Sequence, residues 1–244
     1  HPENINKEIF LKKSIWLSFT PIWKLNSYLE CISSKNNNLL SNLKLLIICS
    51  SSSVITKRFS FNKYDKNLYK SILDSENNLF KLSKNNGINC FIIQPTLIYG
   101  NSANYKDKNF NKINSLLNKF PILITPKNCG LRQPIHIKEL AKFIEHLINS
   151  FIAGDKCEQK KFAIGGDITL NYYEMLKGLQ DALPNKSRGK NCKLVRIPDK
   201  LFYFIIAPIA LFSPKFYEAL LRMSSNLSGF NPVHKLLNTK KNNE

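Results

Sequence analysis

The stretch Leu43–Val54, LKLLIICSSSSV, joins an almost continuous apolar run to four consecutive serines. The serines alone are compatible with a flexible linker. An apolar run of this kind buries both of its faces, as a central strand of a parallel sheet does when helices cover both sides. The stretch therefore predicts a buried strand whose carboxyl end presents hydroxyl groups.

Short apolar runs alternate with longer stretches of helical periodicity, which predicts an α/β fold with a Rossmann-like, doubly wound parallel sheet. Strands are expected at Ile15–Phe19, Leu43–Cys49, Cys90–Gln94, Ile122–Ile124, Lys161–Ile164 and Leu194–Ile197. Helices are expected at Leu25–Ile32, Asn67–Ser83, Asp107–Leu117, Ile137–Phe151, from a Thr169 cap to Leu183, and at Asp199–Phe212 and Pro214–Met223. Residues 1–165 should form the C-terminal half of the Rossmann-like domain with interleaved segments of a substrate lobe, and residues 166–244 mainly that small α/β lobe and the C-terminal helices.

The chain of 244 residues has a formal net charge of +19, which raises nucleic acid or an anionic membrane as partners. Its lysines are spread along the chain rather than clustered, so a solvated basic surface is favoured. Nucleic acid is a possible but not a favoured partner, and no membrane partner is expected. The longest apolar run, Leu201–Phe212 (LFYFIIAPIALF), is too short to span a bilayer and is interpreted as a buried helix.

The six cysteines are widely spaced and form no C-x-x-C pair, so neither a metal site nor a disulfide framework is indicated. A reducing, cytoplasmic location is expected from this pattern.

Four motifs occur in a fixed order along the chain. They are CSSSSV (Cys49–Val54), QPTLIYG (Gln94–Gly100), RQPIHI (Arg132–Ile137) followed by Glu139-Leu140-Ala141, and FAIGG (Phe162–Gly166) leading to Tyr173-Glu174-Met175-Leu176. Together they resemble the extended short-chain dehydrogenase/reductases, the NAD-dependent epimerase/dehydratase family, over roughly Ile15–Leu237.

The resemblance implies NAD or NADP as the cofactor and a nucleotide-linked sugar or similar polar metabolite as the substrate. Ser51 matches the catalytic hydroxyl of the family, and Arg132 matches an arginine that pairs with a nucleotide diphosphate. The other residues implied in cofactor binding are Thr20, Pro21, Ser50, Pro95 and Leu97, and those implied in substrate binding are Ser52 and Tyr99. His136 is interpreted as a structural histidine in a strand-to-helix turn.

Two departures from the family pattern are visible. The chain contains no G-x-x-G-x-x-G turn, and its first strand resembles the fourth strand of the family, so the sequence is expected to be truncated and Ile15–Phe19 to be an exposed apolar edge. Anchored on Glu76, the family's Tyr-x-x-x-Lys pair falls on Leu68 and Ile72, and neither of these side chains can exchange a proton.

We therefore expect an NAD(P)-binding, epimerase/dehydratase-like protein without the usual Tyr/Lys chemistry. The alternative is a non-catalytic Rossmann scaffold that binds RNA or a protein complex, and a degenerate fragment is a third interpretation. The sequence leaves open whether the chain is catalytically active, which cofactor and substrate it takes, and whether it forms a homodimer.

Overall fold

The computed structural model describes residues 13–35, 40–100, 108–155 and 159–239. The chain divides into two compact units. Unit 1 is built from His1–Phe59, Lys66–Thr96 and Leu140–Ile164, and unit 2 from Ser60–Asp65, Leu97–Glu139 and Gly165–Glu244. Each unit therefore collects segments that are far apart in the sequence.

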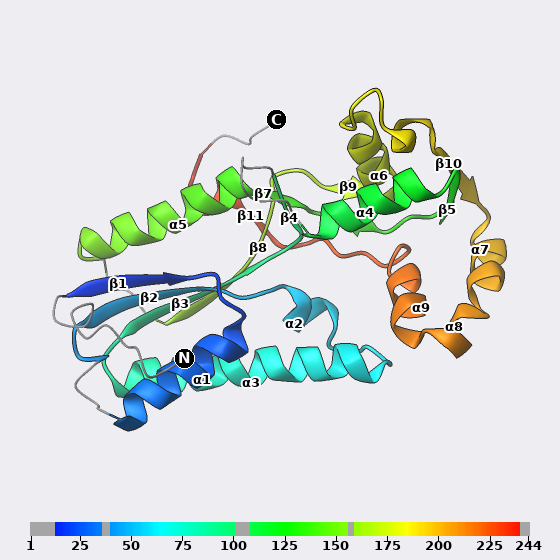
Figure 1. Cartoon of the computed structure of the whole chain (residues 1–244). Helices are drawn as coiled ribbons and strands as arrows, with labels where there is room; N and C mark the ends of the chain where they lie inside the picture. Colours follow the sequence, from blue (N-terminus) through cyan, green and yellow to red (C-terminus); the bar gives the residue numbers. More distant parts are fainter. Residues whose placement is uncertain (1–12, 36–39, 101–107, 156–158, 240–244) are drawn as a thin grey trace. The chain divides into compact units, whose positions relative to one another are not determined.

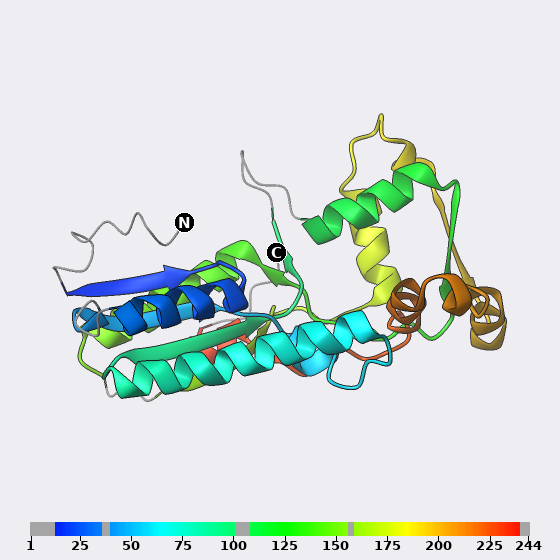
Figure 2. The same cartoon turned by 60° about the horizontal axis from the view of Figure 1, so that its bottom comes forward.

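Unit 1 contains a parallel sheet with helices on both faces (Figure 1). Its strands are β1 (Ser14–Ser18), β2 (Leu43–Cys49), β3 (Asn89–Pro95) and β8 (Lys160–Gly165), and its helices are α1 (Ile22–Lys35), α2 (Ser53–Thr56) and most of α3 (Lys63–Asn85) and α5 (Ile137–Ile152). The strand order is β1-β2-β3-β8, and each neighbouring pair is parallel. Figure 1 shows α1 and α3 on one face of this sheet and α5 on the other, and Figure 2 shows α1 and α3 side by side. The predicted α/β fold with a parallel, doubly wound sheet is confirmed.

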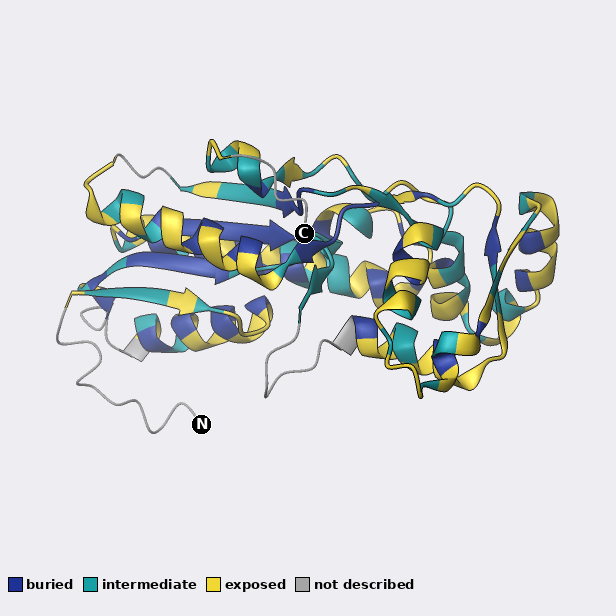
Figure 3. Cartoon of the chain, turned by 90° about the horizontal axis from the view of Figure 1, so that it is seen from above, coloured by how far each residue is buried: buried dark blue, intermediate teal, exposed yellow. Residues whose placement is uncertain are grey.

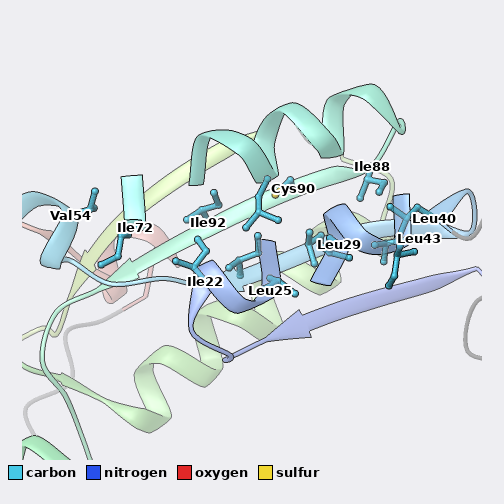
Figure 4. Close-up of a cluster of buried hydrophobic side chains, with 14 residues drawn as sticks. Ile22, Leu25, Leu29, Leu40, Leu43, Val54, Ile72, Ile88, Cys90 and Ile92 are labelled. Carbon is cyan, nitrogen blue, oxygen red and sulfur yellow. The ribbon is translucent and has the colours of Figure 1, made fainter. Parts of the chain in front are cut away.

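The core of unit 1 lies on both faces of β2 and β3, which are dark blue in Figure 3. Between the sheet and helices α1 and α3, Leu29 and Ile92 are fully buried (Figure 4), and the fully buried Leu79 and Ile48 belong to the same cluster. On the opposite face Phe143 of α5 makes an edge contact with Phe162, at 5.2 Å between ring centroids. Burial on both faces is what the LKLLIIC run predicts for a central strand.

Strand β1 lies at one edge of the sheet formed by the described strands. Leu17 is 43% exposed, and Phe19, just beyond the strand, is 61% exposed. The prediction of an exposed apolar edge strand is confirmed for the part of the chain that the structure describes. A groove of about 590 Å³ runs beside this strand and is lined by Ile15, Trp16, Leu17, Ser18, Thr20, Lys24, Leu25 and Tyr28.

Unit 2 is made of short strands and short helices. Its strands are β4 (Ile98–Tyr99), β5 (Ile122–Pro126), β6 (Leu131–Arg132), β7 (Ile135–His136), β9 (Leu170–Asn171), β10 (Lys193–Ile197) and β11 (Asn231–Pro232). Its helices are α4 (Lys108–Lys119), α6 (Tyr172–Asp181), a 3₁₀ turn (Arg188–Asn191), α7 (Asp199–Ile206), α8 (Ile209–Phe212), α9 (Pro214–Leu221) and α10 (Val233–Leu236). The pairs β4·β7 and β5·β10 are parallel, whereas β6·β9 is antiparallel.

Two expectations about unit 2 are wrong. Asn171, not Thr169, caps α6: its side chain accepts from the Glu174 amide, and the Glu174 side chain accepts from the Asn171 amide, which forms a capping box. The stretch Leu201–Phe212 is not a buried helix, because it forms two short helices of which most side chains are exposed. Within the described parts of the chain, no helix has both the length and the apolar character that a bilayer crossing requires.

Candidate functional site

The four serines form a tight turn at the carboxyl end of β2. The Ser50 amide donates to the Ile93 carbonyl at 2.7 Å, and the Ser52 amide donates to the Pro95 carbonyl at 3.0 Å. The turn is therefore fastened to the neighbouring strand β3, at the edge of the sheet where open α/β folds bind ligands. It is an ordered strand end and not a linker.

The hydroxyl of Ser51 lies in a local turn of its own. Its Oγ accepts from the Ser53 amide at 3.1 Å and donates to Ser53 Oγ at 3.0 Å. Ser52 precedes α2, and its side chain does not cap that helix. Both serines are half-buried, and their roles in catalysis and substrate binding remain predictions.

The hydroxyl of Ser50 is connected to a buried carboxylate. Ser50 Oγ donates to Glu76 Oε1 at 2.6 Å, and Gln94 Nε2 lies 2.8 Å from each carboxylate oxygen. Lys161 Nζ lies 2.9 Å from Glu76 Oε2 and forms an ion pair with it. We call these four residues the Glu76 cluster: they come from the serine turn, α3, β3 and β8 and all belong to unit 1.

The Glu76 cluster compensates the cost of removing the Glu76 carboxylate from water. The Glu76 side chain is 0% exposed, and an isolated carboxylate would be very costly to bury. Each of its oxygens has a neutral hydrogen-bond donor, and Lys161, whose side chain is 31% exposed, supplies the compensating charge while keeping contact with water. The cluster fixes the Ser50 hydroxyl at the end of β2.

The positions assigned to the family's tyrosine and lysine lie in the apolar core of unit 1. Ile72 is 3% exposed within the cluster of Figure 4, and Leu68 packs against that cluster. Their side chains serve packing, and they provide no proton-transfer group next to the serine turn.

Thr20 and Pro21 follow the carboxyl end of β1, and both are exposed. The Pro21 carbonyl accepts from the amides of Lys24 and Leu25 and so begins α1. Thr20 lines the groove beside β1. Pro95 is buried at the end of β3 and accepts from the serine turn. In a parallel sheet these strand ends lie along one edge, as the sequence predicts.

A larger hollow of unit 1, of about 770 Å³, lies elsewhere. Its lining comes from the carboxyl-terminal turns of α1 and α3, including Ser34 and Asn85. Helices that follow parallel strands run back to the opposite edge of the sheet, so this hollow is away from the serine turn. We assign no role to it.

Leu97 and Tyr99 belong to unit 2. The Leu97 carbonyl accepts from the Ile135 amide at 2.9 Å. The Tyr99 ring makes edge contacts with His136 and Phe110, at centroid distances of 5.0 and 5.8 Å. Burial, and secondarily the charge of Glu139, raise the pKa of the Tyr99 phenol above its ordinary value. The phenol therefore stays protonated at neutral pH and can donate a hydrogen bond there.

Arg132 is 8% exposed, and its guanidinium is occupied by unit 2 itself. It donates to the carbonyls of Leu131 and Ser225 at 2.7 Å each and to that of Arg222, and it stacks 5.0 Å from the centre of the Tyr172 ring. Burial, as the main cause, lowers its pKa from the ordinary value, although the group remains a cation. A diphosphate-binding role for Arg132 remains a prediction, and the observed contacts hold the β6 segment to the turn after α9.

Two carboxylates organise the start of α5 in unit 2. Glu139 accepts from the amides of His136 and Asp167, and Asp167 Oδ1 lies 2.9 Å from His234 Nδ1. His136 Nδ1 accepts from the Lys138 amide, as expected for a histidine that shapes a strand-to-helix turn. A Cβ on Gly166, beside Asp167, would lie 2.0 Å from the Pro134 carbonyl, so that only glycine fits there. Among the described residues, no group of three His, Cys, Asp or Glu side chains could hold a metal ion.

The comparisons with known proteins identify the fold. No protein-family model matches the sequence, and the curated proteins contain no significant match. Solved structures do match: a protein described as gox2253 has a TM-score of 0.57 at 12% identity, over 98% of this chain and 76% of its own. The dTDP-4-dehydrorhamnose reductase from Bacillus anthracis, solved in complex with NADP, has a TM-score of 0.50 at 13% identity, over 92% of this chain and 73% of its own.

The chain shares its fold with these two solved structures. The fold expected from the four motifs is therefore confirmed. The UDP-N-acetylglucosamine 4-epimerase from Bacillus cereus also matches, with a TM-score of 0.47 at 18% identity over 75% of this chain. This chain spans 64% of the length of that epimerase.

The sequence indicated the serine turn but not the ion pair within the Glu76 cluster. Glu76 lies between Ile72 and Leu79 on the apolar face of α3, and a charged residue on such a face signals a buried partner. The partner could not be chosen from the sequence, because Lys161 is one of many lysines and reaches Glu76 from a strand that is distant along the chain.

Proposed function

We propose that this chain binds the nicotinamide end of NAD(P) together with a polar substrate, in the manner of a nucleotide-sugar epimerase or reductase, and that it acts in the cytoplasm. The observation that carries the proposal is the serine turn fastened to β3 at the carboxyl end of a parallel sheet. The resemblance of the four motifs supports it, and so does a fold shared with a reductase that was solved with NADP.

The residues of unit 1 fit one end of such a cofactor. The strand ends offer an exposed Thr20, a half-buried Ser50 and a buried Pro95 along one edge of the sheet. They do not fit the pyrophosphate, because no glycine-rich turn occurs among the 244 residues. We therefore assign the nicotinamide end of the cofactor, and not its diphosphate, to these residues.

The bound nicotinamide would supply hydride transfer, and the protein would supply orientation. Ser51 and Ser52 would orient a hydroxyl of the substrate, while Tyr99 would donate a hydrogen bond and Arg132 would hold the nucleotide diphosphate. Because Leu68 and Ile72 cannot exchange a proton, the proposal does not include the usual tyrosine–lysine proton transfer. A catalytic member would need a different acid or base.

Titration of the protein with NADH and NADPH, followed by nicotinamide fluorescence, tests this proposal. We expect weak, saturable binding that decreases when Ser50 is changed to Trp, whose bulk would block the strand end. A folded sample that binds neither nucleotide would contradict the proposal.

The second candidate is a non-catalytic scaffold that binds RNA. The apolar side chains at positions 68 and 72 and the net charge of +19 favour it. Phosphate contacts lose affinity steeply as salt increases. Retention on a polyanion that falls steeply with salt, together with no nucleotide binding, would favour the scaffold over the NAD(P)-binding protein.

A further inference from the structure

The helices α7, α8 and α9 of unit 2 expose an apolar surface that the proposed function does not use. Phe204 is 79% exposed, Leu211 85% and Phe212 88%. We call this surface the apolar face and define it by Leu201, Phe204, Ile205, Leu211, Phe212 and Phe216. Isolated exposed apolar residues are common, but a group of this size on three consecutive helices is a mark of an interaction site.

Helix α7 is apolar on both of its sides. Phe202 and Ile206, one turn apart, are 0% and 3% exposed and pack into unit 2. Leu201, Phe204 and Ile205 share the other side because they are three and four residues apart. A helix that is apolar all round is normally covered on all sides. Within the described residues of unit 2, only the side of Phe202 and Ile206 is covered.

Helix α8 follows α7 after Ala207 and Pro208, and its Leu211 and Phe212 are exposed as well. Both Ala207 and Pro208 have helical backbone angles, so the chain bends at the proline without leaving the helical conformation. Ser213 then caps α9, with its side chain accepting from the Phe216 amide. Figure 1 shows the three helices as consecutive short segments of unit 2.

The segment Ser60–Asp65 extends this surface with aromatic residues. It is tied to α9 by the Asn62 amide, which donates to Glu218, and by Asp65, which lies 3.0 Å from Arg222 in an ion pair. Phe61 is 85% exposed, and Tyr64 lies under Lys215, whose Nζ is 3.4 Å from the ring centre. Tyrosine is enriched at membrane–water interfaces, where its amphipathic ring lies at the level of the headgroups.

The charges around the apolar face favour an anionic partner. The carboxylate of Glu218 is buried against Asn62 and Arg222, and Asp199 accepts two hydrogen bonds from Asn128. Lys200, Lys215 and Lys63 are exposed, in a chain with a net charge of +19. These three exposed lysines place positive charge beside the bulky apolar side chains, whereas Glu218 is buried and Asp199 is half-buried.

We propose that the apolar face docks onto the surface of an anionic lipid bilayer. Phe204, Leu211 and Phe212 enter the headgroup region, and the neighbouring lysines contact lipid phosphates. A protein partner would fit less well, because the cores of protein interfaces are depleted of lysine. The proposal concerns surface attachment, and it is independent of the cofactor proposal.

Sedimentation with vesicles tests the proposal. Wild-type protein should bind vesicles of phosphatidylcholine and phosphatidylglycerol more tightly than vesicles of phosphatidylcholine alone. The variant Phe204→Ser/Leu211→Ser/Phe212→Ser should bind the anionic vesicles more than about tenfold more weakly, because three apolar side chains lose their burial in lipid. The matched control is Phe59→Ser/Ile152→Ser, which removes side chains of unit 1 that are 82% and 69% exposed and should leave binding unchanged.

The lysines are tested separately. Lys200→Gln/Lys215→Gln should weaken binding to the anionic vesicles by about tenfold and leave binding to neutral vesicles unchanged. Circular dichroism should show that all variants are folded, since every changed side chain is exposed. Wild-type protein that binds neither kind of vesicle would overturn the proposal. A homodimer in solution that the triple variant abolishes would also overturn it, by assigning the apolar face to a second copy of the chain.

Discussion

The Glu76 cluster of unit 1 buries a charged side chain, whereas the apolar face of unit 2 exposes apolar side chains to water. Glu76 is a charge without access to water, and Phe204 is an aromatic ring that is 79% exposed to it. The carboxylate is compensated within unit 1 by Ser50, Gln94 and Lys161. Within the described part of the chain, the ring has no comparable cover. The first feature is therefore explained by the fold, while the second calls for a partner.

Alanine substitutions at two residues of α7 should give the largest difference in the free energy of unfolding. Phe202→Ala should lower the free energy of unfolding by about 3–5 kcal/mol, because it leaves a cavity where a fully buried ring was. Phe204→Ala, only two positions further on, should change it by less than about 0.5 kcal/mol. Urea denaturation followed by circular dichroism measures both. Equal losses would show that Phe204 is packed against protein, and the docking proposal would lose its basis.

The ion pair of the Glu76 cluster gives the next largest effect. Lys161→Met should lower the free energy of unfolding by about 1–3 kcal/mol, because a buried carboxylate loses its counter-charge, and partial exposure of Lys161 limits the loss. The double variant Lys161→Met/Glu76→Gln should recover part of that loss, since it removes the uncompensated charge. Additive losses in the double-mutant cycle would indicate that the two side chains do not interact.

Alanine substitutions at the neighbouring Ser50 and Ser51 should give a smaller difference in stability. Ser50→Ala removes a donor from the Glu76 carboxylate and should cost about 1–2 kcal/mol of stability. Ser51→Ala removes only contacts to Ser53 and should cost less than about 1 kcal/mol. Thermal denaturation can separate the two. A larger loss for Ser51 would indicate that its hydroxyl has a partner beyond the turn.

The buried thiol of Cys90 should change how the stability of the protein depends on pH. Burial raises the pKa of the Cys90 thiol from its ordinary value of 9.0 to about 12. The unfolded thiol therefore ionises first, and the contribution of Cys90 is full below pH 9 and is lost as the pH rises toward about 12. The stability of the wild type should fall more steeply above pH 9 than that of Cys90→Ala. Parallel pH profiles would contradict this assignment.

Much of unit 1 could be predicted from the sequence because its signals are local. The LKLLIIC run marks β2, and Gly87, with φ of +63°, lies just beyond the end of α3, where a glycine favours helix termination. The edge position of β1 followed from the family resemblance. The contribution of Lys161 could not be predicted, because ion pairs between distant segments leave no periodic signal.

The α7–α8 region shows where a prediction from local composition fails. Apolar composition alone indicated burial, since a run such as LFYFIIAPIALF is normally found in a core. The structure shows that the segment is divided at Pro208 into short helices and that only Phe202 and Ile206 are buried. Hydropathy measures what a side chain prefers, whereas exposure depends on how much protein surface is available to cover it.

The position of Lys161 on β8 has a consequence for how unit 1 folds. A folding intermediate that contained α3 and β1 to β3 but lacked β8 would enclose the Glu76 carboxylate with neutral donors alone. Such a species carries an uncompensated buried charge and should not accumulate. The closure of a long loop of chain must therefore accompany the assembly of the sheet, which favours slow folding in a single cooperative step.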